Sequence, residues 1–245
     1  YPAMNKALLY LTLLIALILV SNNTFAQKEF SGTFTMHILT SDKTDKEIPL
    51  SWYLQSKKEG GKMAMQIMDD QLAKGVNKRV IFNPSDSTWL MLMGVNKIKQ
   101  GTKIHRAAMF RDSTESPIYT PLKVKETKII NGYQCYKFTL KTKKNISEIW
   151  VTNQIQCNIG FIYKLLRHCG MIETSARKGD WYRSKYIKGM ILEIHSQNLV
   201  TKEDYTMKIT DLQLAVTKKE LLDTDGYRIS VIPEGQNCGV QESDN

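Results

Sequence analysis

The chain has 245 residues, of which 42% are hydrophobic and 24% are charged. These values are ordinary for a globular domain and exclude a largely disordered or collagen-like chain. The 34 basic and 24 acidic residues give a net charge of +10. Because the lysines occur in scattered pairs and never in a long run, the charge indicates a solvated basic surface rather than a nucleic-acid site.

The first 26 residues predict a cleaved export signal. Lys6 is followed by an apolar run over residues 7–20 and then by a small-residue cleavage site between Ala26 and Gln27. At 1.5 Å per residue, this run covers only about 21 Å of the roughly 30 Å hydrocarbon core. We therefore expect a signal peptide over residues 1–26. The mature domain, residues 27–245, is expected to be a single soluble β-rich domain in the periplasm or outside the cell, with a loose C-terminal tail.

Alternating apolar residues predict a series of strands in the first half of the mature chain. The alternation is clearest over residues 34–38, 52–54 and 63–67. The run 89–93 is apolar at every position, as expected of a strand that is buried on both sides. A turn cluster at 83–86 separates this run from the strand before it.

The clearest local structure is a hairpin over residues 128–140. Its turn is Asn131–Gly132, the dipeptide that best tolerates the two positive φ angles of a type I′ turn. A partner strand is predicted over residues 148–152, after a polar turn at 143–145. This block is the most strongly specified part of the sequence.

The last third of the chain predicts two more strands and the best helix candidate. The strands cover 186–195 and 205–216, and the apolar parity of the second changes near Thr210–Asp211, which predicts a β-bulge. The segment 160–169 has a helical apolar stripe, and Gly170 follows it as a stop signal.

The sequence carries no signature of a metal site, a cofactor or an enzyme. There is no C-x-x-C motif, no clustered His and Cys at zinc spacing, and no nucleophile elbow or phosphate-binding glycine loop. We therefore predict no catalytic residue, no metal and no cofactor. The four cysteines allow disulfides of unknown pairing, or free thiols packed as small apolar groups; they are Cys135, Cys157, Cys169 and Cys238.

Methionines on the same side of predicted strands suggest the wall of a ligand-binding cavity. Met63 and Met65 are two residues apart and would lie on the same side of a strand. Met91, Met93 and Trp89 would likewise share one side of their strand. Because methionine is flexible and polarizable, such a wall adapts to ligands of variable shape, although the same residues could simply fill a core. The candidate cavity residues are Phe34, Met36, Met63, Met65, Trp89, Met91 and Met93.

The hairpin block resembles a known family. The sequence of residues 130–138, INGYQCYKF, followed by EIWVT at 148–152, is similar to an uncharacterised family of exported domains common in Bacteroidota. That family is distantly similar to the periplasmic lipoprotein carriers of the LolA type. Residues 188–193 and 232–235 resemble a later strand and the C-terminal end of the family, whereas 157–180 fit no family pattern.

The resemblance implies a fold and a general function. The expected fold class is a β-rich α+β domain: a strongly curved antiparallel sheet, or incomplete barrel, with one or two helices on its concave side. A cavity of this half-barrel would bind a lipid or a lipoprotein acyl chain. The alternative is a non-catalytic structural or interaction protein of the cell envelope, whose basic surface contacts an anionic membrane or another protein. The oligomeric state is left open.

Overall fold

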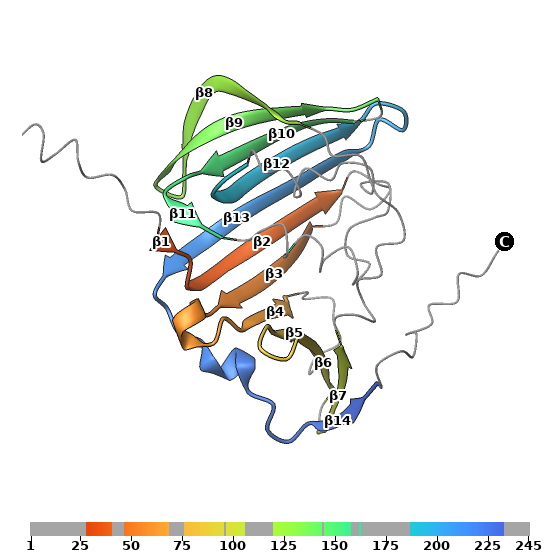
Figure 1. Ribbon diagram of the computed structural model, residues 1–245. Helices are drawn as coiled ribbons and strands as arrows, with labels where there is room; N and C mark the ends of the chain where they lie inside the picture. The colour runs from red at the N-terminus through yellow and green to blue at the C-terminus, as the bar shows by residue number, and fades with distance from the viewer. Residues whose placement is uncertain are drawn as a thin grey trace, which may run out of the picture.

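The structure of the chain is a computed structural model in which most of the described residues form strands (Figure 1). The residues that it describes are 28–40, 47–68, 76–95, 97–105, 120–143, 145–157, 162 and 187–232. The predicted signal peptide with its Ala26–Gln27 cleavage site, and the segment 160–169 except Ile162, lie outside the described residues. Within the described residues, no helix is long and apolar enough to cross a membrane.

Twelve of the strands form one sheet. In chain order these are β2 (Gly32–Thr40), β3 (Glu47–Leu54), β4 (Met63–Ile67), β5 (Val76–Asn83), β6 (Thr88–Val95), β7 (Ile98–His105), β8 (Leu122–Ile130), β9 (Tyr133–Lys141), β10 (Asn145–Thr152), β12 (Met190–Asn198), β13 (Asp204–Leu214) and β14 (Arg228–Val231). Two very short strands, β1 (Lys28–Glu29) and β11 (Ile155–Gln156), pair in parallel as a separate small sheet.

The large sheet consists of two antiparallel meanders joined side by side. Its order is β14-β7-β6-β5-β4-β3-β2-β13-β12-β10-β9-β8. The first meander runs from β2 to β7 and the second from β8 to β13; β2 and β13 pair antiparallel at the junction. Only β14 pairs in parallel within this sheet, with β7. Because β8 and β14 are both edges, the sheet is open, and Figure 1 shows how strongly it curves from one edge to the other.

The predicted fold class is wrong in its helical part. An open, curved antiparallel sheet is present, but most of the described residues lie in strands and they place no helix on its concave side. Apart from the single helical residue Ile162, their only helical turns are the 3₁₀ turns η1 (Lys57–Glu59) and η4 (Lys219–Leu222). Within the described residues, short turns join most neighbouring strands, and the strands alternate apolar and polar side chains rather than following a helical period.

The hairpin and the bulge were predicted correctly. Asn131 and Gly132 have φ angles of 51° and 79°, as a type I′ turn requires. The register of β13 against β2 shifts between Thr210 and Gln213, where the apolar parity of the sequence changes. The hairpin tip reaches back to this bulge, because Asn131 Nδ2 donates a 2.7 Å hydrogen bond to the backbone oxygen of Ile209.

One face of the sheet, which we term the inner face, carries the main core. Phe34 of β2 pairs with Trp52 of β3, and Trp52 pairs with Met65 of β4, so their side chains form a row across the strands. All three are at most 1% exposed, and the rings of Phe34 and Trp52 stack with centroids 6.1 Å apart. Phe30, which follows β1, packs edge-on against Phe34. The centre of the inner face is therefore filled.

The opposite, outer face is partly covered by a segment that we term the strap, residues 215–232. The strap leaves β13, passes η4 and ends in β14 beside β7 (Figure 1). Leu221 of η4 is buried among outer-face residues of the first meander, which include Tyr53, Ile81 and Leu92. The strap therefore connects the end of the second meander to the far edge of the first.

Candidate functional site

The inner face is hollowed over β4–β7. A hollow of about 510 Å³ lies there, open on one side. Its inner-face walls come from Ile67 of β4, Lys78 and Val80 of β5, Met91 and Met93 of β6, and Gln100 and Thr102 of β7. A volume of this size falls within the ~300–1,000 Å³ that is usual for small-molecule sites.

Burial changes abruptly along strand β6 at the edge of this hollow. Trp89 is 0% exposed and its ring lies 4.4 Å from that of Phe82, the residue it pairs with on β5. Met91 and Met93, on the same side of the same strand, are 41% and 45% exposed. The strand therefore passes from a rigid aromatic floor to two accessible, flexible apolar side chains within four residues.

The seven predicted cavity residues all project from the inner face, but they are not equivalent. Met91 and Met93 line the hollow. Met63 is half-buried against the core. The other four are buried core residues: Phe34, Met36, Met65 and Trp89. The structure thus brings two of the seven to an accessible surface, and the binding of a ligand by them stays a prediction.

Two basic neighbours at the hollow point in opposite directions. Lys78 alternates with Val80 on the inner face and is exposed. Arg79 is only 7% exposed, and its guanidinium donates hydrogen bonds to the backbone oxygens of Glu220 and Asp223 in the strap. The sequence signal that marks Lys78 is a single charge on the apolar side of an alternating strand.

A second, smaller hollow lies on the inner face near the other edge of the sheet. It has a volume of about 390 Å³. Lys123 of β8 and Tyr136 of β9 contribute to it, and Lys123 Nζ lies 4.4 Å from the centroid of the Tyr136 ring. The remaining lining residues are Pro121, Phe138, Val151, Asn153 and Lys188.

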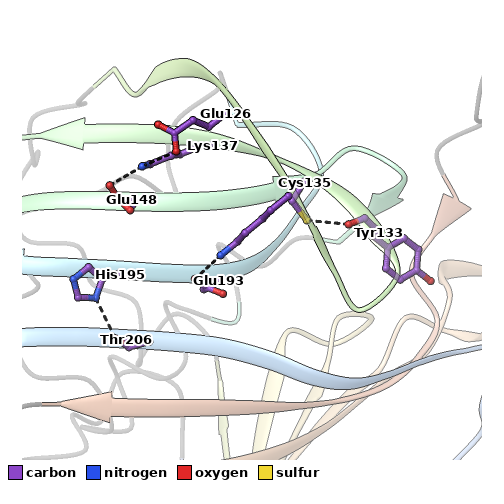
Figure 2. A network of polar contacts seen from close by, with 9 residues as sticks. Glu126, Tyr133, Cys135, Lys137, Glu148, Glu193, His195 and Thr206 are labelled. Carbon is purple, nitrogen blue, oxygen red and sulfur yellow. Dashed lines mark hydrogen bonds and ion pairs between the residues drawn. The ribbon is translucent and has the colours of Figure 1, made fainter.

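The outer face of the second meander carries a network of charges (Figure 2). Lys137 Nζ lies 2.7 Å from Glu148 and 3.2 Å from Glu126. The hydrogen bond that Lys137 donates to Glu148, followed by the one it donates to Glu126, raises the pKa of Lys137. Lys128 pairs with Glu193 at 2.8 Å and lies 4.3 Å from the ring of Trp150. Because these charges are matched within the network, the arrangement is typical of a cross-strand structural ladder.

The histidines and carboxylates do not gather into a metal site among the described residues. His195, on the outer face of β12, shares a 3.2 Å hydrogen bond with Thr206 (Figure 2). His37 contacts Glu47 and Thr210. Each of these two histidines is thus joined to a neighbouring strand.

Two of the four cysteines lie in the described residues, and both are free. Cys135 is buried, and its Sγ donates a hydrogen bond of 3.5 Å to the backbone oxygen of Tyr133 (Figure 2). Burial raises the pKa of Cys135 to about 11 and that of Cys157 to about 12. Thiols of such high pKa are poor nucleophiles at neutral pH. Cys169 and Cys238 lie outside the described residues.

Several solved structures are similar to this chain at low sequence identity. PNGF-II aligns with a TM-score of 0.41 and 13% identity, over 83% of this chain and 32% of its own; this chain thus spans about a third of the length of PNGF-II. A LolA superfamily protein from Nitrosomonas europaea aligns with a TM-score of 0.33 and 8% identity, over 82% of this chain and 92% of its own.

A third similar structure is a putative outer membrane lipoprotein-sorting protein domain from Vibrio parahaemolyticus, with a TM-score of 0.31 and 8% identity, over 77% of this chain and 88% of its own. No curated protein matches the sequence. The model of one family, described as a domain of unknown function (DUF4412), matches residues 30–225, and the chain belongs to that family.

Proposed function

We propose that this protein is an exported, non-catalytic carrier or receptor that binds the apolar chain of a lipid in the hollow over β4–β7. One observation supports the proposal above the others. Met91 and Met93 are left 41% and 45% exposed on the face of the sheet that otherwise carries the core. Large apolar side chains that stay accessible beside a hollow are a feature of ligand-binding surfaces.

The physical basis of binding is the replacement of water by an apolar chain. Covering a methionine side chain contributes roughly 1–2 kcal/mol to the binding free energy. Met91, Met93 and Val80 together therefore supply a substantial share of the roughly 8 kcal/mol that a micromolar affinity requires. Trp89 and Phe82 beneath them are already packed and need no ordering on binding. A rigid aromatic pair beneath flexible methionine side chains suits a ligand whose length and branching vary.

The place of action rests on the sequence. The apolar run of residues 7–20 and the small-residue site at Ala26 support export. A protein outside the cytoplasm that shields an acyl chain from water would serve transfer between envelope surfaces. In the alternative, an envelope interaction protein, the hollow would stay empty and only the basic surface would make contacts.

The test is titration of the protein with diphenylhexatriene, a neutral apolar probe that fluoresces when it leaves water. The proposal expects saturable binding that dodecan-1-ol displaces. The double variant Met91→Lys, Met93→Lys should weaken binding of the probe by about a hundredfold, since charges replace both apolar side chains.

The matched control is Leu39→Lys, because Leu39 is 41% exposed, like Met91, but lies on the outer face of β2. This variant should bind the probe as the wild type does. If the wild-type protein does not bind the probe, or if the double variant and Leu39→Lys weaken binding equally, the hollow is not the binding site.

A further inference from the structure

We infer that the ligand of the hollow is an amphiphile with an anionic head, a long-chain carboxylate, whose head is held by Lys78 and whose tail lies over Met91. This inference rests on the proposed function and adds the chemical class of the ligand. It depends on the position of a single charge in an otherwise uncharged wall.

Lys78 is the only charged side chain among the described inner-face residues of β4–β7. The strand pairing fixes which residues share its face. All of the others are apolar, except the neutral polar residues Gln100 and Thr102. On the outer face of the same strands, by contrast, Arg79, Lys99 and Lys103 are spread among neutral residues. A lone cation within an apolar wall is therefore specific to the side that holds the hollow.

The register places the charge at one end of the hollow and the apolar floor at the other. Lys78 pairs with Met93, and Met93 pairs with Gln100, so an ammonium and an amide lie in the same cross-strand row. The next row on this face is Val80, Met91 and Thr102, and the row after it contains Phe82 and Trp89. Rows on one face are about 6–7 Å apart, so the polarity changes over a distance that a lipid head and its first methylenes occupy.

Lys78 is available to a ligand, whereas Arg79 is not. Lys78 is exposed, and none of the ion pairs between described residues involves it. The guanidinium of Arg79 is turned to the outer face and bonded to the strap. Among the described residues, an anion that enters the hollow from the inner side therefore meets one cation, which matches a singly charged head.

The desolvation of Lys78 makes the charge of the ligand matter. An apolar chain seated over Met91 and Met93 would also exclude water from the neighbouring ammonium, which is unfavourable for an uncompensated charge. A carboxylate offsets this cost with a charge-assisted hydrogen bond, and a second cation would add repulsion. The protein should therefore bind a ligand with an anionic head most tightly, one with a neutral head less tightly, and one with a cationic head most weakly.

The experiment is calorimetric titration with three ligands of the same chain length: dodecanoate, dodecan-1-ol and dodecyltrimethylammonium, each below its micelle concentration and at mildly alkaline pH. We expect dodecanoate to bind about tenfold more tightly than dodecan-1-ol, and Lys78→Met to remove that preference. The dodecan-1-ol affinity of this variant should stay equal or rise. Lys78→Arg should keep most of the preference.

Lys141→Met is the matched control, since Lys141 is exposed on β9, away from the hollow, and its loss lowers the net charge equally. It should leave the preference for dodecanoate unchanged. Equal binding of all three ligands, or equal effects of Lys78→Met and Lys141→Met, would overturn the inference while leaving the proposed function intact. Binding of none of the three would instead remove the proposed function itself.

Discussion

Arg79 Nη1 donates a hydrogen bond to the backbone oxygen of Glu220, which joins the middle of the first meander to the strap. Nη2 donates a second bond to the backbone oxygen of Asp223. Because Arg79 is buried, these two carbonyl groups replace the water that its guanidinium loses. The ring of Tyr227 lies 5.8 Å from the same guanidinium and 5.4 Å from Lys99 Nζ. The strap is therefore held by a buried charge as well as by β14.

Replacing Arg79 by methionine should loosen the strap. The variant Arg79→Met keeps the apolar stem but removes the guanidinium hydrogen bonds to the backbone oxygens of Glu220 and Asp223, at a cost of about 2–4 kcal/mol of unfolding free energy. Urea denaturation measures the loss. Arg228→Met, which changes an exposed arginine of β14, should cost little. Equal losses for the two variants would show that Arg79 does not hold the strap.

Alanine at Gly189 should be far more harmful than alanine at Gly132. Gly189 has a φ of 112°, and a Cβ there would lie 2.1 Å from the backbone oxygen of Thr152, beside the start of β12. We expect Gly189→Ala to cost about 3 kcal/mol or more. Gly132 also has a positive φ, but nothing lies within 4 Å of its Cβ position, so Gly132→Ala should cost about 1 kcal/mol. Thermal unfolding compares them, and similar losses would contradict the close approach.

The hairpin tip should depend on the amide of Asn131. In Asn131→Gly the turn keeps its positive φ but loses the hydrogen bond to Ile209, so the protein should lose about 1 kcal/mol. Lys202, in the turn between β12 and β13, also has a positive φ of 65°. Lys202→Gly relieves strain there and should be neutral or stabilising. Chemical denaturation of both variants makes the comparison; a stable Asn131→Gly protein would mean that the bond contributes nothing.

The thiols of Cys135 and Cys157 should resist alkylation in the folded protein. Burial disfavours both thiolates, and their pKa values are raised to about 11 and about 12. Iodoacetamide at neutral pH should label neither residue until guanidinium chloride unfolds the chain, and labelling should then need no reducing agent. Peptide mapping by mass spectrometry reports each residue separately. Labelling of the native protein would contradict the raised pKa values of the two thiols, and a need for reductant would contradict free thiols.

The same burial predicts a loss of stability in alkali. A thiol whose pKa rises from 9.0 to about 11 on folding keeps its proton in the native state while the unfolded chain ionises. The unfolded state then binds fewer protons, so the unfolding free energy falls as the pH rises above 9.0, over the interval up to about 11. Cys135→Ala should lose less stability over this interval than the wild type. Identical pH profiles would show that Cys135 ionises equally in both states.

The sequence predicted the local structure of the sheet well because alternation and turn chemistry are local signals. The Asn131–Gly132 turn and the bulge after Thr210 lie where the pattern placed them. The resemblance carried by the hairpin block agrees with the match to a family of unknown function over residues 30–225. Export, lipid binding and the bacterial source remain predictions.

The features that the sequence did not reveal are set by distant contacts. Strand β14 has only four residues, so its short alternation gave no sign of its parallel pairing with β7. Lys78 and Arg79 are adjacent in the sequence, yet one projects from each face of β5. The alternation of methionines in the sequence does not distinguish Met65, which is fully buried, from Met91, which is exposed. Burial depends on what packs against the strand rather than on the sequence of the strand itself.

The pairing of β2 with β13 constrains how the chain can fold. Ile38 and Met207 are neighbours in the sheet although almost the whole domain lies between them in the chain. Closing such a long loop is entropically costly, and folds with high contact order form slowly, on the scale of milliseconds to seconds. Each meander can nucleate through its own turns, but their edges stay unpaired until β13 has been synthesised. The domain therefore completes its folding only after β13 has left the ribosome, with its edge strands open to a chaperone in the meantime.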